Sequence, residues 1–392
     1  MSNTSFKPGR HFLQIPGPSN VPDSVLRAMA QPVIDHRGPD FPALTFNILE
    51  QIKPVFNTES PVFIYPASGT GGWECALLNA LSPGDKVLAF ETGHFATLWK
   101  EVADKLGLDV QWILGDWRHG VDPEKVEEAL TLDTQHSIKA VLAVHTETST
   151  GVTSQISKVR QAIDAANHPA LFFVDAVSSL ACTEYFHDDW KVDVTVSGSQ
   201  KGLMLPPGLS FNAVSEKALA AFKQSKSHHS YWRWDAMLSF NEKGYYPYTP
   251  STNLLYGLQE ALSLLHQEGL DNVFARHRRF AEATRRAVNA WGMENICLNP
   301  DEFCNSTTAV LVPEGQNADA LRDIILRRFN MSLGTGLGKL KGKIFRIGHI
   351  GDLNELMLAG TLSGVEMGLG LSGIPYKKGG VNAALDYLAE TE

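Results

Sequence analysis

The stretch that decides the fold is residues 171–202, LFFVDAVSSLACTEYFHDDWKVDVTVSGSQKG. It holds two short runs, LFFVD (171–175) and DVTVSG (193–198), whose aliphatic and aromatic content is typical of strands covered on both faces. Asp175 closes the first run and Lys201 follows the second. In open α/β sheets, ligands bind beyond the carboxyl ends of the strands. We therefore expect the functional site to lie where these two runs end.

The same pattern continues toward the N-terminus of the chain. Further apolar runs are VFIYP (62–66), KVLAF (86–90), DVQWIL (109–114) and KAVLAVH (139–145). Helical candidates lie between the runs, among them GWECALLNAL, FATLWKEVADKLG and VDPEKVEEAL. Alternating strands and helices predict an α/β fold with a mostly parallel sheet and right-handed crossovers.

The second half of the chain is organised differently. Residues 223–256 are rich in aromatic residues and lack clean periodicity, which is typical of a functional or interface segment. A long helix is expected over about 254–291, and after it strands and helices mix in an α+β pattern. We predict an N-terminal segment (1–20) over the active site, a large domain (21–274) and a small C-terminal domain (275–392).

Composition restricts the class of protein. The net charge of −9 argues against nucleic acid as the main partner, because phosphate binding needs a basic face. No apolar run approaches the ~20 residues of a membrane helix, and the start of the chain does not resemble a secretory signal. We expect a cytoplasmic protein with reduced, buried cysteines. The histidines lack ligand spacing, so no metal is expected.

Three local features indicate chemistry. Lys201, in SGSQKG (197–202), is either a surface lysine or an amine placed to bond a carbonyl group. Asp175 is either the N-cap of the following AVSSL or a buried acid that needs a partner. The segment SGTGG (68–72) is either a tight turn or an anion cradle at a helix N-terminus. It is neither GxGxxG nor a Walker pattern, which disfavours nucleotide binding.

In this order the residues resemble a known family, the class V aminotransferases of the alanine–glyoxylate and serine–glyoxylate group. The motifs that carry the resemblance are PGPSN (16–20), SGTGG (68–72), HTETSTGV (145–152), VDAVSS (174–179), SGSQKG (197–202), YYPYTPST (245–252) and FRIGHIG (345–351). The resemblance implies pyridoxal 5′-phosphate (PLP) fold type I. That fold has a large domain, with a mostly parallel seven-stranded sheet sandwiched by helices, and a smaller α+β C-terminal domain.

The resemblance also implies roles for residues around the cofactor. Lys201 would bond the cofactor and carry the substrate's Cα proton to the cofactor carbon C4′. Asp175 would bind the pyridine nitrogen. The remaining expected contacts are Ser68, Gly69 and Thr70 on the phosphate, Gln200 beside it, Phe95 stacked on the ring, and Thr148 or Ser149 near the ring hydroxyl.

Further roles concern the substrate and the neighbouring subunit. Arg346 would bind the substrate α-carboxylate through its planar fork of donors, and Gly17 would approach the substrate. Tyr246 and Thr249 would reach the cofactor phosphate of a neighbouring subunit, which implies a homodimer or a higher oligomer with shared sites. Arg37, with His36, either contacts a substrate side chain or is a structural loop charge.

The resulting hypothesis is a ping-pong transaminase that acts on small amino acids and 2-oxo acids. It takes the amino group of L-serine and transfers it to glyoxylate, giving hydroxypyruvate and glycine. Aspartate and alanine remain alternative donors, and Arg37 keeps aspartate open. A lyase or cysteine desulfurase of the same fold is a further alternative, although no cysteine follows Cys304 to act as the desulfurase nucleophile. A non-enzymatic binding module leaves Lys201, Asp175 and Arg346 unexplained together.

Overall fold

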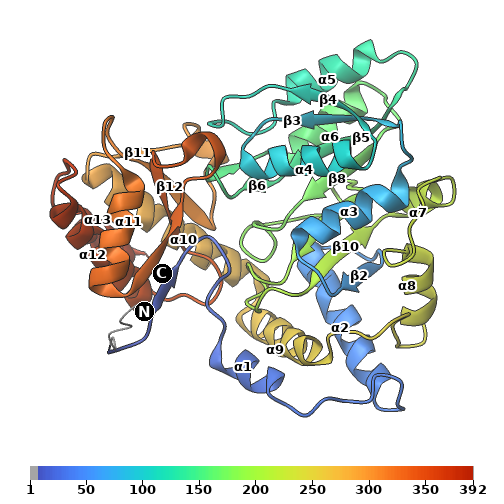
Figure 1. The fold of residues 1–392 in the computed structure, drawn as a ribbon, viewed down its shortest axis with the longest axis horizontal. Helices are drawn as coiled ribbons and strands as arrows, with labels where there is room; N and C mark the ends of the chain where they lie inside the picture. The colour runs from blue at the N-terminus through green and yellow to red at the C-terminus, as the bar shows by residue number, and fades with distance from the viewer. Residues whose placement is uncertain (1–7, 392) are drawn as a thin grey trace, which may run out of the picture.

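The computed structural model describes residues 8–391, and its larger part is built on a seven-stranded sheet (Figure 1). In spatial order the strands are β2 (Val62–Tyr65), β10 (Ser210–Val214), β9 (Val194–Gly198), β8 (Leu171–Asp175), β5 (Ile138–Val144), β3 (Lys86–Phe90) and β4 (Asp109–Ile113). β10 pairs antiparallel with both β2 and β9, and the other neighbouring pairs of this sheet are parallel. The mostly parallel seven-stranded sheet is confirmed.

Helices cover this sheet on both faces. Every residue of β2, β8, β9 and β10 is buried. Because successive side chains of a strand point to opposite faces, full burial means that both faces are covered. The helices of this part are α1 (Asp23–Met29), α2 (Phe41–Phe56), α3 (Gly69–Ala80), α4 (His94–Lys105), α5 (Pro123–Leu132), α6 (Ile156–Ala165), α7 (Glu216–Phe222), α8 (Trp234–Asn241) and α9 (Thr252–Glu268).

The sequence pattern identifies six of the seven strands and misses β10. Its sequence, SFNAV, places Ser210 and Asn212 among the apolar residues, so it does not form a continuous apolar run. Both side chains are nevertheless fully buried. The side-chain amide of Asn212 donates to the carbonyl oxygen of Gly72 at 3.3 Å, which partly satisfies the buried polar group.

The long helix expected over about 254–291 is two helices. The first is α9, and the second is α10 (Leu270–Ala290). The break is Gly269, whose φ of +84° and ψ of 130° lie outside the helical region. This conformation favours glycine because it has no Cβ. The segment 223–256 is also less irregular than expected, since it contains α8.

A second, five-stranded sheet supports the C-terminal part of the chain. Its order is β1 (Phe12–Gln14), β13 (Met331–Thr335), β14 (Ile344–Gly348), β12 (Thr307–Leu311) and β11 (Glu294–Asn295). The helices of this part are α11 (Ala318–Phe329), α12 (Glu355–Ser372) and α13 (Gly380–Glu390), together with α10 and the short 3₁₀ turns η1 (Pro300–Glu302) and η2 (Gly338–Leu340). The expected α+β character of this part is confirmed.

The N-terminal strand β1 belongs to the C-terminal sheet. It pairs in parallel with β13, with Leu13 opposite Ser332 (Figure 1, where the blue N-terminal strand lies beside the orange and red part). After β1 the chain crosses closely over this sheet. A Cβ on Gly348 would lie 2.1 Å from the carbonyl oxygen of Ile15, and a Cβ on Gly334 would lie 2.7 Å from Pro16 Cδ. Glycines at these two positions therefore let residues 15–17 pass toward the large sheet.

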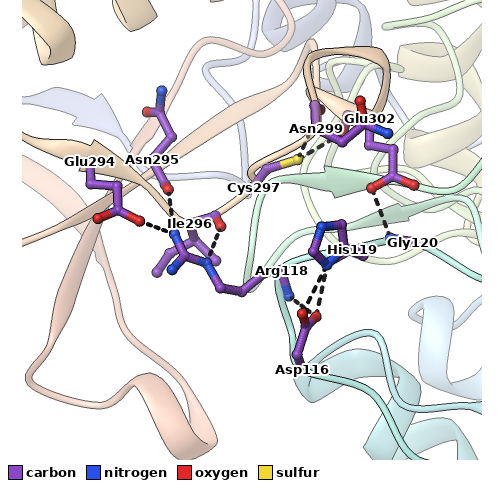
Figure 2. Close-up of polar contacts among 10 residues, drawn as sticks. All are labelled: Asp116, Arg118, His119, Gly120, Glu294, Asn295, Ile296, Cys297, Asn299 and Glu302. Carbon is purple, nitrogen blue, oxygen red and sulfur yellow. Dashed lines mark hydrogen bonds and ion pairs between the residues drawn. The ribbon is translucent and has the colours of Figure 1, made fainter.

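A loop of the large part also binds the C-terminal part directly (Figure 2). Arg118 follows β4, and its Nε and Nη2 donate to the carbonyl oxygens of Ile296 (2.9 Å) and Asn295 (3.2 Å). The backbone N–H of Gly120 donates to Glu302 Oε2 at 3.2 Å. These contacts hold the two parts together beside the carboxyl ends of β3 and β4.

The distribution of buried apolar side chains supports the proposed domain division at about residue 275. One hydrophobic cluster extends from Val25 to Val273, and a second extends from Phe280 to Leu388. We retain 21–274 and 275–392 as proposed domains, with 1–20 as a separate segment. Within residues 8–391, no helix combines the length and the apolar character needed to cross a membrane.

We predict that α12 stabilises the C-terminal part mainly through its buried face. Leu362 is fully buried, so Leu362→Ala should lower the free energy of unfolding by about 2–5 kcal/mol through lost contacts and a cavity. Leu356 on the same helix is 82% exposed, so Leu356→Ala should change the free energy of unfolding by less than about 0.5 kcal/mol. Urea unfolding followed by circular dichroism measures both values. Equal losses in the two variants would contradict the described packing.

Candidate active site

A cavity of about 240 Å³ lies beyond the carboxyl ends of β8 and β9 and beside the first turn of α3. The residues that line it come from the N-terminal segment, from the loops after β2, β8 and β9, from the short strand β6 (Thr146–Glu147) and the residue after it, and from α3 and α4. They are Gly17, Pro18, Ser68, Gly69, Thr70, Trp73, Phe95, Thr146, Thr148, Asp175, Val177, Ser178, Gln200, Lys201 and Pro207. The structure thus brings together nine of the predicted site residues.

Lys201 is buried in this cavity, so the reading as a surface lysine is wrong. It is 7% exposed, and its Nζ donates to the carbonyl oxygen of Pro16. Burial lowers the pKa of Lys201 from 10.5 to about 8, with the positive charge of Arg346 as a smaller contribution. Gly17, at a φ of +112°, passes so close that a Cβ there would lie 2.5 Å from Lys201 Cδ. The N-terminal segment therefore covers the lysine.

Asp175 is the last residue of β8 and is 4% exposed. Burial raises the pKa of Asp175 to about 7, although the hydrogen bond from the backbone N–H of Val177 to Oδ1 (2.7 Å) opposes the rise. An N-cap residue also accepts a hydrogen bond from a backbone N–H that follows it, so this contact with Val177 agrees with the N-cap alternative. No helix follows, however, because residues 177–182 form turns. A buried carboxyl group that titrates near neutrality is typical of a functional site.

The glycine-rich segment forms the start of α3. Ser68 is the N-cap residue and Gly69 the first helical residue, and the Ser68 side chain does not cap the helix. The first-turn N–H groups and the helix dipole favour an anion at this end. A Cβ on Gly69 would lie 2.7 Å from Val177 Cγ2, so a larger residue would displace the cavity wall. Ser68 and Thr70 are exposed at the rim of the cavity.

Gln200, Thr148 and Phe95 complete the predicted lining. Gln200 has a buried side-chain oxygen, Oε1, that has no hydrogen-bond partner within residues 8–391. The hydroxyl group of Thr148 contacts that of Ser178. Ser149 does not line the cavity, because its hydroxyl group donates to Glu147 Oε1 at 2.7 Å. Of the two alternatives in the sequence, Thr148 is therefore the residue that faces the cavity.

Arg346 lies on β14 of the small sheet and reaches the edge of this site. Its Nε donates to the carbonyl oxygen of Thr335 and its Nη1 to that of Thr148, both at 2.8 Å. Burial lowers the pKa of Arg346 to about 10, while the negative charge of Glu147 opposes this. No carboxylate within residues 8–391 forms an ion pair with Arg346. A buried cation held only by carbonyl oxygens is suited to binding an anion.

The structure does not bring the other three predicted residues to the cavity of their own chain. Tyr246 is buried against Phe41, with ring centroids 6.1 Å apart, and its hydroxyl group has no partner within the described residues. Arg37 is exposed, and its Nε donates to His36 Nε2 at 3.3 Å. Thr249 is also exposed and lies 3.5 Å from the same nitrogen through its hydroxyl group. Segment 35–38 and the loop near 249 therefore lie together on the surface.

Sequence reasoning does not single out several residues that line the cavity. Trp73 and Thr146 are two of them, and Ser178 is another although VDAVSS contains it. Trp73 belongs to a helix that the periodicity predicts, but which of its faces meets a cavity depends on the fold. The four cysteines are buried and unpaired, as expected. Within residues 8–391, no cluster of three or more His, Cys, Asp or Glu residues could hold a metal ion, and the absence of a metal stays a prediction.

Comparison with known proteins assigns the family. The family model described as aminotransferase class-V matches residues 11–336. The chain belongs to the class V aminotransferases. A serine–glyoxylate aminotransferase of Methylorubrum extorquens is 50% identical to this aminotransferase, with 98% of this chain and 97% of the relative covered. An L-aspartate–glyoxylate aminotransferase of Paracoccus denitrificans is 43% identical, with 96% of each chain covered.

Solved structures of similar proteins confirm the fold of this aminotransferase. The ureidoglycine–glyoxylate aminotransferase of Bacillus subtilis superposes with a TM-score of 0.91 at 27% identity, covering 98% of this chain and 99% of that one. The pyridoxamine–pyruvate aminotransferase of Mesorhizobium loti gives the same TM-score, identity and coverage. The resemblance to PLP fold type I aminotransferases is therefore confirmed.

We predict that Lys201 reacts with aldehydes at neutral pH because its pKa is about 8. The neutral amine is the nucleophile, so reactivity should rise with pH and reach half its maximum near pH 8. At pH 7 about 10% of the amine would be neutral, against less than about 0.1% for an ordinary lysine with a pKa of ~10.4. Reductive trapping of a small aldehyde over pH 6–11, with peptide mass spectrometry, measures this. A midpoint near 10.4 would show that water reaches the amine.

Proposed function

We propose that this class V aminotransferase transfers the amino group of L-serine to glyoxylate with PLP as cofactor, giving hydroxypyruvate and glycine by a ping-pong mechanism. The observation that carries the proposal is the shared cavity of Lys201 and Asp175 beside Arg346. A reactive amine, a buried acid and a buried cation are the groups that this chemistry requires of a protein. The similarity to proteins named serine–glyoxylate aminotransferase supports the choice of substrates.

The residues present fit PLP. Gly69 leaves no space for a Cβ, and the first turn of α3 offers N–H groups and hydroxyl groups to a phosphate. We propose Ser68, Gly69, Thr70 and Gln200 as phosphate contacts, with the side-chain NH₂ group of Gln200 as the donor, because an amide oxygen accepts hydrogen bonds and cannot donate to a phosphate. Asp175 would bind the pyridine nitrogen, Phe95 would stack on the ring, and Thr148 would lie near the ring hydroxyl. Bound PLP supplies an aldehyde for amines and stores the amino group between the half-reactions.

Lys201 and Asp175 have separate proposed roles in the reaction. The Lys201 amine would hold the cofactor in the resting enzyme, and once released it would carry the proton of the substrate α-carbon to the cofactor carbon C4′. An amine with a pKa near 8 can accept and donate a proton at neutral pH, which an ordinary lysine does poorly. Asp175 stays beside the ring nitrogen, where a positive partner would stabilise its buried carboxylate.

Arg346 is the proposed ligand of the substrate α-carboxylate. Its Nε and Nη1 are fixed by backbone carbonyl oxygens, so the guanidinium is oriented before substrate arrives. Gly17 borders the cavity from the other side and would approach the bound substrate. Glyoxylate has only an aldehyde and a carboxylate, so a single carboxylate contact together with Lys201 recognises the whole acceptor.

We further propose a homodimer in which each cavity is completed by the partner. Ser68 and Thr70 are exposed at the rim, and Thr249 and Arg37 are exposed away from the cavity of their own chain. A second copy that places its Tyr246 and Thr249 against the rim would supply further phosphate contacts and exclude water. Arg37, close to Thr249 through His36, would then reach the substrate side chain. The cytoplasmic location expected from the sequence remains a proposal.

Aspartate is the alternative donor that similarity to a known protein supports. A donor with a side-chain carboxylate needs a second cation, and Lys201 is the only charged amine that lines the cavity of residues 8–391. We propose a partner's Arg37 as the cation for that carboxylate. Similarity to a protein named L-aspartate–glyoxylate aminotransferase keeps this alternative open. Alanine needs no polar contact in the side-chain pocket. A cysteine desulfurase is disfavoured because no cysteine follows Cys304 to act as its nucleophile.

We predict that L-serine and glyoxylate give hydroxypyruvate and glycine in equal amounts, and that serine reacts at least about tenfold faster than aspartate or alanine. Single-turnover bleaching of the yellow enzyme by each donor, with glycine quantified after adding glyoxylate, measures this. Lys201→Ala should abolish turnover. A faster reaction with aspartate would move the proposal to that donor, and Arg37→Ala should then slow aspartate selectively.

We predict that mixed dimers reveal the shared site. Thr249→Glu places a negative charge at an exposed position and should repel a partner's phosphate, which lowers activity with little change in stability. Co-expression of Thr249→Glu chains with Lys201→Ala chains should restore one site in each mixed dimer. In that site Lys201 and Thr249 come from different chains and both are intact. The absence of any recovered activity in purified mixed dimers would contradict a site completed in trans.

A further inference from the structure

Glu147 is a buried carboxylate beside the active site that the proposed function does not use. It is the last residue of the short strand β6 (Thr146–Glu147), and it is 1% exposed. Its Oε1 accepts hydrogen bonds from the backbone N–H of Ser149 (3.0 Å) and from the Ser149 hydroxyl group (2.7 Å). Its Oε2 accepts one from the backbone N–H of Ala96 (3.0 Å). A buried acid with this many donors is held in one position.

The contacts of Glu147 and Ser149 cap helix α4 from another element. The N-cap residue of α4 is Gly93, which has no side chain to cap the helix. Ser149 Oγ accepts from the N–H of His94 (2.9 Å), and Glu147 accepts from the N–H of Ala96. A carboxylate at this position satisfies free N–H groups and suits the helix dipole. Phe95, which lines the cavity, lies between the two anchored residues.

The segment 147–149 also contacts Arg346, the residue proposed to bind the substrate carboxylate. Thr148 lies between Glu147 and Ser149, and its carbonyl oxygen accepts the hydrogen bond from Arg346 Nη1 at 2.8 Å. Glu147 is therefore joined at one end to the helix that carries Phe95. At the other end it is joined through the chain to the group that orients Arg346.

Gly93 shows how closely helix and carboxylate are packed. A Cβ on Gly93 would lie 2.3 Å from Glu147 Cγ and 2.6 Å from Ser149 Oγ. The φ of Gly93 is 167°, an extended conformation that alanine also adopts, so the restriction comes from contact and not from backbone strain. Substitution at Gly93 therefore displaces Glu147 without changing its charge.

We propose that Glu147 is a positioning residue that fixes Phe95 and Arg346 relative to each other, so that the ring contact and the carboxylate contact of the active site keep one geometry. The inference rests on the proposed function, since it assigns PLP to the Phe95 side and a substrate carboxylate to Arg346. Glu147 touches neither group itself and acts through the first turn of α4 and through Thr148.

The test compares purified holoenzymes of wild type, Glu147→Gln and Gly93→Ala. Glutamine presents one oxygen and one NH₂ group, so at least one N–H donor of α4 or Ser149 loses its acceptor. We expect the KM for glyoxylate and the dissociation constant of PLP each to rise about tenfold, because buried unsatisfied donors would shift both contacts. The visible circular dichroism of bound PLP should fall in intensity, while kcat changes by less than about threefold. Gly93→Ala should give the same pattern through its steric clash.

The matched control is Glu101→Gln on the same helix. Glu101 is exposed, so this variant makes the same change of charge without touching the cavity, and its circular dichroism and KM should equal those of wild type. Variants that unfold at lower temperature but keep the wild-type dichroism and KM would overturn the proposal, because Glu147 would then be only structural. Wild-type protein that takes up no PLP would overturn both this inference and the proposed function, whereas wild-type uptake with unchanged variants overturns this inference alone.

Discussion

Two groups of opposite charge, the carboxylate of Asp175 and the ammonium of Lys201, line one cavity, and both side chains are buried there. Burial raises the pKa of Asp175 to about 7 and lowers that of Lys201 to about 8, so desolvation outweighs their mutual attraction in each case. Both groups thus change protonation close to neutral pH. The rest of the structure holds this unfavourable arrangement in place, and a charged ligand that bonds one group and neutralises the other would relieve it.

The sheet topology places the two groups together. They follow β8 and β9, which are parallel neighbours, so the loops after both strands meet at one edge. The helix start at Ser68 reaches the same edge because β2 is joined to β9 through the antiparallel β10. The remaining wall comes from the small sheet, which brings Arg346, and from the N-terminal segment, which brings Gly17. The site therefore depends on both parts of the chain being in contact.

Much of this arrangement can be predicted from local sequence patterns. Continuous apolar runs identify six strands, and the positions of Asp175 and Lys201 after two of them predict where the cavity lies. Long-range packing was not visible in the same way. The search for apolar runs misses strand β10 because the strand contains polar side chains, and these have buried hydrogen-bond partners only in the folded protein. The break at Gly269 was missed because one glycine in a periodic pattern does not reveal its φ.

The partners of buried groups were the least predictable feature. Ser149 and Thr148 are adjacent in the sequence, yet only the fold shows that the first bonds Glu147 and the second faces the cavity. The importance of Glu147 was likewise hidden, because a lone glutamate in HTETSTGV gives no sign that it caps a helix more than fifty residues earlier in the chain.

The parallel pairing of β1 with β13 determines what an N-terminal truncation of the protein would do. β1 is one of the two edge strands of the small sheet. Two residues later, the carbonyl oxygen of Pro16 accepts the hydrogen bond from Lys201, and Gly17 packs against the same lysine. A chain that began at Gly17 would expose the backbone N–H and C=O groups of β13, a template for pairing between molecules. It would also open the cavity to bulk water. Solubility and the electrostatic environment of the lysine thus depend on the same short stretch of chain.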